Sequence, residues 1–166
     1  MKIAGIIIVF FSCCTAGYLR SLECVKTRDQ IYAFIKLIEH IKHEIAYYLT
    51  RQEDIFLKFE NKYLEKIGFL KILREEKIKD EKSLLYHALQ KSEKYLSLSL
   101  EGKKILYEFA KTLGHLSPSE QCTNCDKAIL QLEELYKKEK EEACARVKLN
   151  RCIGCLGGAF AVLILL

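Results

Sequence analysis

Two cysteine pairs are the residues of this chain best suited to chemistry. Cys122-Thr-Asn-Cys125 and Cys152-Ile-Gly-Cys155 both have the CxxC spacing that zinc sites and redox motifs use, because two thiolates at that spacing can converge. Twenty-six residues separate the pairs, and the second pair lies in an uncharged segment, where a cage of thiolates would bury charge. This leaves Cys122 and Cys125 as a candidate redox or metal pair, which defines an alternative function. We expect the thiols instead to stay reduced and to pack as small apolar side chains.

Two further motifs resemble parts of known sites. His40-Ile-Lys-His43-Glu44 resembles a metalloprotease helix, but its histidines are three residues apart rather than four, and no third ligand follows. The sequence EGKK at residues 101–104 lacks the upstream glycine of a phosphate-binding loop. The sequence therefore predicts a non-enzymatic protein with no metal, no cofactor and no small-molecule substrate.

Apart from Cys152 and Cys155, these residues lie between two uncharged ends of the chain. Residues 3–19 and 152–166 carry no charge, and every charged side chain except Lys2 lies between Arg20 and Arg151. The first end could be a cleaved signal peptide, a lipoprotein signal that uses Cys13 or Cys14, or a retained anchor; Phe10 and Phe11 are too bulky for a good lipoprotein signal. The second end could be a core helix or a membrane span. The first lacks a good cleavage site, and the second has no polar stripe to face water. We therefore expect two transmembrane helices.

This reading divides the chain into three segments. An N-terminal transmembrane anchor is predicted at residues 1–19, a cytoplasmic α-helical bundle at 20–150 and a C-terminal transmembrane helix at 151–166. Basic residues gather on the bundle side of both predicted spans. By the positive-inside rule, this places the bundle in the cytoplasm and both termini outside.

Small residues in the predicted spans indicate close helix packing. Gly154 and Gly158 are four residues apart in the second span, and Cys13 and Gly17 have the same spacing in the first. Small side chains at this spacing let two membrane helices approach closely. We expect Gly154 and Gly158 to pack against the first span or against another protein.

The middle segment has the composition and periodicity of helices. The chain has one proline and is rich in helix-forming residues, and no strand pattern of any length is present. From Asp29 onward, apolar residues recur at three-and-four spacing and predict one helix face, formed by Ile31, Phe34, Ile35, Ile38, Ile41, Ile45 and Tyr48. Further helices are predicted at residues 53–67, 81–95, 101–113 and 119–150, with Gly68 and Gly114 at helix ends and a new helix start at Ser117–Pro118. The predicted fold class is all-α.

The charge pattern limits the partners. The net charge of +5 comes from 27 basic and 22 acidic residues that are interleaved along the chain. Nucleic-acid binding needs a concentrated basic surface, so we expect no nucleic-acid partner.

The order of these features resembles the stage III sporulation protein AB family over nearly the full length. The similarity rests on Ala16-Gly17 at the end of the anchor, on Glu44–Ile45 and a following tyrosine in HIKHEIAYYLT, on Leu113, Gly114, Ser117 and Gln121 in FAKTLGHLSPSEQ, and on Lys148–Leu149, Gly154 and Gly157 before the terminal ILL. Pro118 departs from the acidic residue usual at its place in the family, and the eight cysteines are also unusual.

The resemblance implies a function that composition and residue spacing alone do not indicate. It implies a membrane platform subunit of the channel or secretion-like complex between mother cell and forespore, needed for endospore formation. The helical bundle would be similar to the inner-membrane platform protein of type II secretion systems. The subunit would lie in the mother-cell membrane that faces the forespore and would dock a partner ATPase and other subunits. Glu44, Leu113, Gly114 and Gln121 would be family-signature positions.

Overall fold

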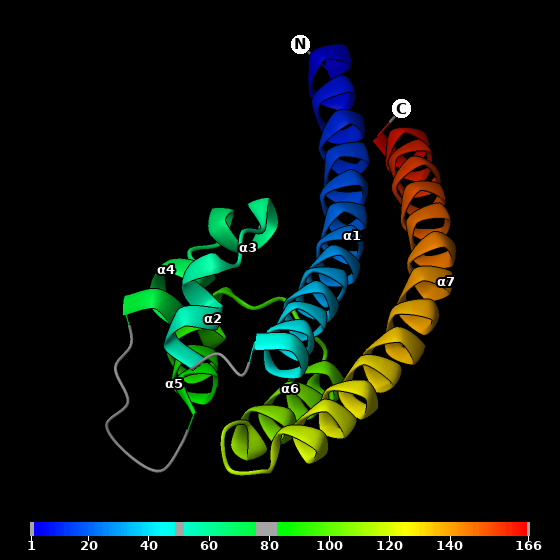
Figure 1. Cartoon of the computed structure of the whole chain (residues 1–166). Coiled ribbons are helices and arrows are strands. Elements are labelled where there is room, and N and C mark those ends of the chain that lie inside the picture. The colour runs from blue at the N-terminus through cyan, green and yellow to red at the C-terminus, as the bar shows by residue number, and fades with distance from the viewer. Residues whose placement is uncertain (1, 49–51, 76–82, 166) are drawn as a thin grey trace. The chain divides into compact units, whose positions relative to one another are not determined.

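All regular elements in the described residues are helical, as the sequence predicted. A computed structural model describes residues 2–48, 52–75 and 83–165, with side chains for residues 25–48, 54–75 and 83–142 and for Thr15, Ala145 and Leu149. The elements, in chain order, are α1 (Lys2–Tyr48), α2 (Gln52–Lys58), α3 (Lys62–Lys66), α4 (Phe69–Glu75), α5 (Leu84–Ser92), the 3-10 helix η1 (Glu93–Tyr95), α6 (Leu100–Thr112) and α7 (Pro118–Leu165) (Figure 1).

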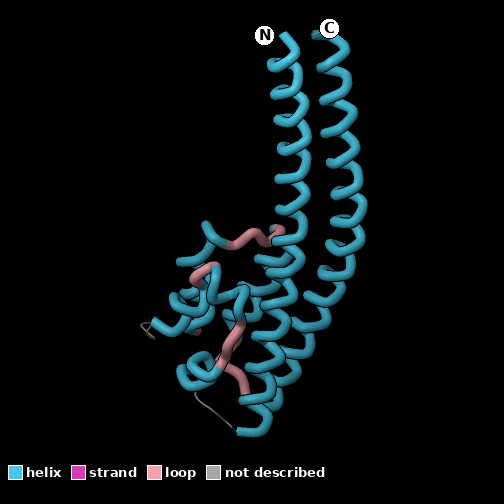
Figure 2. The backbone as a smooth tube through the Cα atoms, turned by 90° about the horizontal axis from the view of Figure 1, so that it is seen from above, coloured by secondary structure: helices cyan, strands magenta, loops and turns pink. Residues whose placement is uncertain are grey.

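The chain forms two compact units. The first unit consists of residues 1–28 and 137–166, and the second consists of residues 29–136. In the first unit, the beginning of α1 and the end of α7 run antiparallel, as both views of the backbone show (Figures 1 and 2). The three segments predicted from the sequence, 1–19, 20–150 and 151–166, stay predictions.

The core of the second unit is built on the part of α1 that belongs to it. The predicted apolar face is buried from Ile31 to Ile45, and Phe34, Ile38 and Ile41 are completely inaccessible to solvent. The short helices α2–α5 gather on one side of this segment, and α7 runs along another (Figures 1 and 2). Tyr48 was predicted on the same face, but it is 64% exposed, because α1 ends there and its last turn extends beyond the core.

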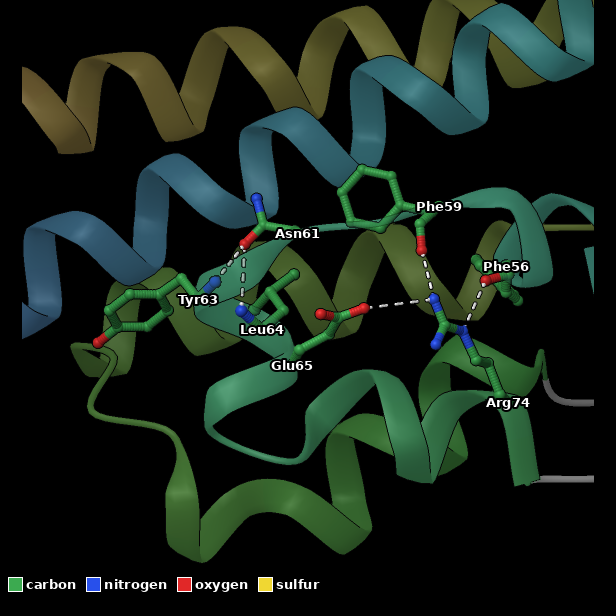
Figure 3. A network of polar contacts seen from close by, with 7 residues as sticks. All are labelled: Phe56, Phe59, Asn61, Tyr63, Leu64, Glu65 and Arg74. Carbon is green, nitrogen blue, oxygen red and sulfur yellow. Dashed lines mark hydrogen bonds and ion pairs between the residues drawn. The ribbon is translucent and has the colours of Figure 1, made fainter.

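The predicted helix at residues 53–67 is wrong: the structure has two short helices, α2 and α3, with a break between them. Asn61 begins α3 as its N-cap, and its side-chain oxygen accepts hydrogen bonds from the backbone N–H groups of Tyr63 and Leu64 (Figure 3). An N-cap has extended backbone geometry, and a helix therefore cannot pass through it. The apolar periodicity persists across the break, since Phe56 and Phe59 are buried before Asn61 and Tyr63 and Ile67 are partly buried after it. This is why the sequence suggested one helix.

Helix α4, which the sequence analysis did not predict, caps the C-terminal end of α2 through its residue Arg74. Arg74 Nη2 donates a hydrogen bond of 2.7 Å to the backbone oxygen of Phe59, and Nε donates one of 3.5 Å to the oxygen of Phe56 (Figure 3). The same guanidinium lies 3.7 Å from a carboxylate oxygen of Glu65 in α3. Carbonyl groups at the end of a helix lack hydrogen-bond donors within the helix, and the Arg74 guanidinium supplies such donors here. Gly68, with a positive φ of 77°, ends α3 and lets α4 begin at once.

The predicted helices at residues 81–95 and 101–113 correspond to α5 with η1 and to α6. Ser83 is the N-cap of α5, and its hydroxyl also donates a hydrogen bond to the backbone oxygen of Ala110 in α6. Ser99 caps α6 by accepting a hydrogen bond from Gly102 N. Each cap is worth about 1 kcal/mol, and helices this short depend on such contacts.

The turn between α6 and α7 confirms the predicted helix start at Ser117–Pro118. Gly114 has a positive φ of 90° directly after the buried Leu113, as a glycine beyond a helix end should. Ser117 N and Oγ both donate to the Glu120 carboxylate, and Glu120 N donates to Ser117 Oγ. This reciprocal arrangement is a capping box, with Pro118 in the first helical position, where its missing N–H costs nothing.

No helix is long and apolar enough to cross a membrane among the residues whose side chains are described. Where their backbone is described, the predicted spans at residues 1–19 and 151–166 lie in α1 and α7, but of their side chains only that of Thr15 is described.

The capping box predicts a pH dependence of stability. Hydrogen bonds from the Ser117 hydroxyl and from its backbone N–H lower the pKa of Glu120 below its usual 4.5. A lowered pKa in the folded state adds stability that is present above pH 4.5 and is lost as the pH falls through the folded value. Urea unfolding should therefore show the wild type losing its advantage over Glu120→Gln between pH 6 and pH 3. Other carboxylates titrate in both proteins, so a difference that stays constant over this range would contradict the assignment.

A candidate interaction groove between α1 and α7

A groove in the second unit lies between α1 and α7. It has a volume of about 470 Å³ and is lined by Glu39, Lys42, His43, Ala46, Tyr47, Asp126 and Ile129. The α1 residues lie three and four positions apart, so they share one face of that helix. Asp126 and Ile129 likewise share one face of α7. The groove is therefore bounded by the outward faces of two neighbouring helices.

Two contacts fix how these helices pair. Lys42 Nζ lies 2.5 Å from the carboxylate of Asp126, and the rings of Tyr32 and Tyr136 have their centroids 5.8 Å apart. The two contacts are ten residues apart on each helix, with the order reversed, so the helices run antiparallel and in register here. The hydrogen bond to Asp126 raises the pKa of Lys42 above its usual value, and the ammonium group keeps its charge.

Aromatic side chains surround one end of the groove. The His43 ring lies 4.8 Å from the ring of Tyr47 and 5.9 Å from that of Tyr48. The Lys58 ammonium lies 5.8 Å from the centre of the Tyr48 ring. Both tyrosines are largely exposed, at 74% and 64%. This end of α1 therefore presents three rings to solvent.

The histidines and glutamate of the metalloprotease-like motif do not converge. His40 Nε2 is 3.1 Å from the backbone oxygen of Ile55, and its ring packs on Phe59. His43 is exposed at the groove, whereas Glu44 is buried and accepts a hydrogen bond of 3.3 Å from Lys58. The three side chains thus serve separate contacts. Within the part of the chain that the structure describes, they form no metal-ligand set.

The candidate pair Cys122 and Cys125 lies in the second and third turns of α7. Cys125 is completely buried and Cys122 is partly buried. Burial raises the pKa of the Cys125 thiol to about 12, which suppresses the thiolate that metal binding and redox exchange require. No group of three or more potential ligands is present among the described residues, and this leaves the redox or metal alternative without support.

The segment EGKK at residues 101–104 has a structural explanation. Gly102 is buried at the start of α6, where an added Cβ would lie 3.2 Å from a methyl carbon of Leu135. Lys103 pairs with Glu93 and Lys104 with Glu108. The glycine therefore allows α6 and α7 to approach closely, and the lysines pair with glutamates of η1 and α6.

Comparison with known proteins identifies the family. The model of the family described as stage III sporulation protein AB matches residues 2–166, which is nearly the whole chain. The chain belongs to the stage III sporulation protein AB family. No curated protein and no solved structure matches it.

The signature positions expected for a stage III sporulation protein AB have structural roles in this chain. Glu44 joins α1 to α2 through Lys58. Leu113 and Gly114 form the buried end and the left-handed turn of α6. Gln121 Nε2 donates a hydrogen bond of 2.8 Å to the backbone oxygen of Leu116 and so helps to hold the α6–α7 turn. The described contacts of all four residues maintain the bundle.

The predicted packing residues Gly154, Gly158, Cys13 and Gly17 lie in α7 and α1, but their side chains are outside the described residues. The sequence analysis in turn missed the groove itself. The sequence signal for the groove was weak: Ala46 and Tyr47 are uncharged residues on the charged side of an amphipathic helix.

The burial of Cys125 predicts a difference in thiol reactivity. In two variants that keep only Cys122 or only Cys125, iodoacetamide at pH 8 should alkylate Cys122 at least tenfold faster, since only the thiolate reacts. In urea the two rates should become similar. Equal rates in the folded proteins would contradict the burial of Cys125.

Proposed function

We propose that this chain is a non-enzymatic membrane platform subunit of the complex that connects the mother cell and the forespore. Its helical bundle would dock a partner ATPase and other subunits from the mother-cell side. The observation that carries the proposal is the family match to residues 2–166, because that match includes both uncharged ends as well as the bundle between them.

The absence of charge from the two ends supports a membrane location. Residues 3–19 would form a helix of roughly 25 Å at about 1.5 Å per residue, slightly shorter than a hydrocarbon core of about 30 Å. The C-terminal run at residues 152–166 is shorter still. A bilayer can thin locally, and a flanking arginine such as Arg151 can extend to the interface, which makes such lengths tolerable.

Exposed apolar side chains support docking by the bundle. Tyr95 and Leu100 lie at the two ends of the segment that joins η1 to α6, and they are 62% and 87% exposed. Tyrosine is enriched at protein interfaces because it combines a large apolar area with a hydroxyl group. A subunit docked there would cover both side chains.

The membrane arrangement predicts a labelling pattern. In a cysteine-free chain expressed in intact vegetative cells, an impermeant maleimide should label Lys2→Cys but not Lys111→Cys, an exposed position in α6. Permeabilising the cells should make both positions reactive, which is the control. Labelling of Lys111→Cys in intact cells would overturn the predicted orientation.

The four-residue spacing of Gly154 and Gly158 predicts that a larger side chain at Gly158 weakens partner binding. In sporulating cells, Gly158→Ile should reduce co-purification of membrane partners about fivefold, because close helix contacts in membranes contribute on the order of 1 kcal/mol. Ala159→Ile is the matched control, since it places the same side chain on a different face of the same helix. Chain abundance should be unchanged in both variants. Equal recovery of partners with both would remove the role assigned to Gly154 and Gly158.

A further inference from the structure

The first unit carries the excess positive charge of the chain. Residues 1–28 and 137–166 contain ten basic and four acidic side chains, whereas residues 29–136 contain 17 basic and 18 acidic ones. The net charge is therefore +6 in the first unit and −1 in the second. The charges of the second unit balance, but an excess of one sign attracts a partner of the opposite sign.

This excess lies next to the two uncharged ends. Residues 20–28 follow the first end, and residues 143–151 precede the second. We call these two segments the basic collar. Their only acidic residue is Glu23, and their basic residues are Arg20, Lys26, Arg28, Arg146, Lys148 and Arg151. Residues 137–142 contain three lysines and three glutamates, so the collar and Lys2 account for the whole excess of the first unit.

The helix pair brings the two segments of the collar to one level. The beginning of α1 and the end of α7 run antiparallel in the first unit (Figures 1 and 2). The two uncharged ends therefore lie at the same end of the pair, and a segment of the collar adjoins each of them. Nine helical residues extend about 14 Å. This length is comparable to a headgroup layer of about 6 Å together with a Debye length of about 8 Å.

The spacing of the collar residues indicates what could bind them. Lys26 and Arg28 are two residues apart, and so are Arg146 and Lys148. At about 100° per residue, positions two apart lie on nearly opposite faces of a helix. A protein or a nucleic acid that docks on one side of the helix pair would meet only part of the collar. A layer of lipid headgroups meets an inserted helix on every side that the other helix leaves open.

Charge, position and spacing thus favour one class of ligand. Clusters of roughly four to eight basic residues beside a transmembrane segment are typical of sites for anionic lipids. We propose that the basic collar binds the phosphate groups of anionic phospholipids in the membrane that holds the two ends. The proposal rests on the membrane location in the proposed function, and it adds a lipid selectivity. The positive-inside rule alone does not require that selectivity, because it concerns orientation and not the surrounding phospholipid.

Retention of phospholipids by the purified full chain tests this selectivity. The chain in a mild non-ionic detergent is equilibrated with equimolar phosphatidylglycerol and phosphatidylcholine and is purified again, and the retained lipids are counted by mass spectrometry. Phosphatidylglycerol should be retained at least about fivefold over phosphatidylcholine, since each basic residue near an anionic surface raises binding by about that factor. Equal retention by a chain that cells hold in their membranes would overturn this inference and leave the proposed function standing. A chain recovered in the soluble fraction of cells would overturn both.

Charge variants assign the effect to the collar. A triple variant with Arg146→Gln, Lys148→Gln and Arg151→Gln should reduce the preference at least about threefold, because it removes three positive charges beside the second end. Arg146→Lys with Arg151→Lys keeps the charge and should keep the preference. The matched control removes three exposed lysines of the second unit and should also keep it: Lys94→Gln, Lys111→Gln and Lys127→Gln. An unchanged preference in the collar triple variant, or an equal loss in either control, would overturn the assignment.

A salt comparison distinguishes a lipid headgroup from a soluble phosphate compound. Sodium phosphate and sodium chloride at equal ionic strength should release the retained phosphatidylglycerol to the same extent, because both screen the charges of the collar equally. A greater release by phosphate would assign the collar to a soluble phosphate compound and overturn lipid binding.

Discussion

The bundle depends on the need to bury one unusually wide apolar surface of α1. Between Ile31 and Ile45, buried side chains occupy more than the single stripe of an ordinary amphipathic helix, since Leu37 and Ala33 are buried beside the predicted face. One neighbouring helix covers only one stripe, so such a segment needs cover from several directions. Helix α7 supplies part of the cover, and the short helices supply the rest. Removal of either set would leave α1 with apolar surface in water.

The short helices that provide this cover are individually too short to be stable. Helices α2, α3 and α4 have seven, five and seven residues, well below the length at which an isolated helix forms in water. Their ends are held by specific polar contacts: Asn61 at the start of α3 and Arg74 at the end of α2. Buried residues from all three, Phe56, Leu64 and Phe69 among them, then complete the core. Tertiary packing and capping together stabilise what local propensity cannot.

The residues that first suggested chemistry have structural roles in the bundle. The side chain of Cys125 in α7 is buried in the core, His40 contacts a backbone oxygen of α2, and Gly102 permits the close approach of α6 to α7. Polar and exposed apolar groups gather instead on the outward faces of α1 and α7. This distribution is compatible with the docking role proposed above for this member of a sporulation family.

The sequence by itself determined the all-helical class, the core face of α1 and the start of α7, because each is encoded locally. Apolar spacing specifies which face is buried, and Ser117, Pro118 and Glu120 supply a complete capping signal within one turn. Family membership was also readable, since it rests on the order of residues along the chain. The break between α2 and α3 has a local part, the Asn61 cap, and a tertiary part, which the sequence pattern did not show. Its apolar period continues through Phe59, and the Arg74 side chain that ends α2 comes from a later helix. The groove was likewise hidden, because Lys42 and Asp126 are 84 residues apart and meet only when α1 and α7 pair.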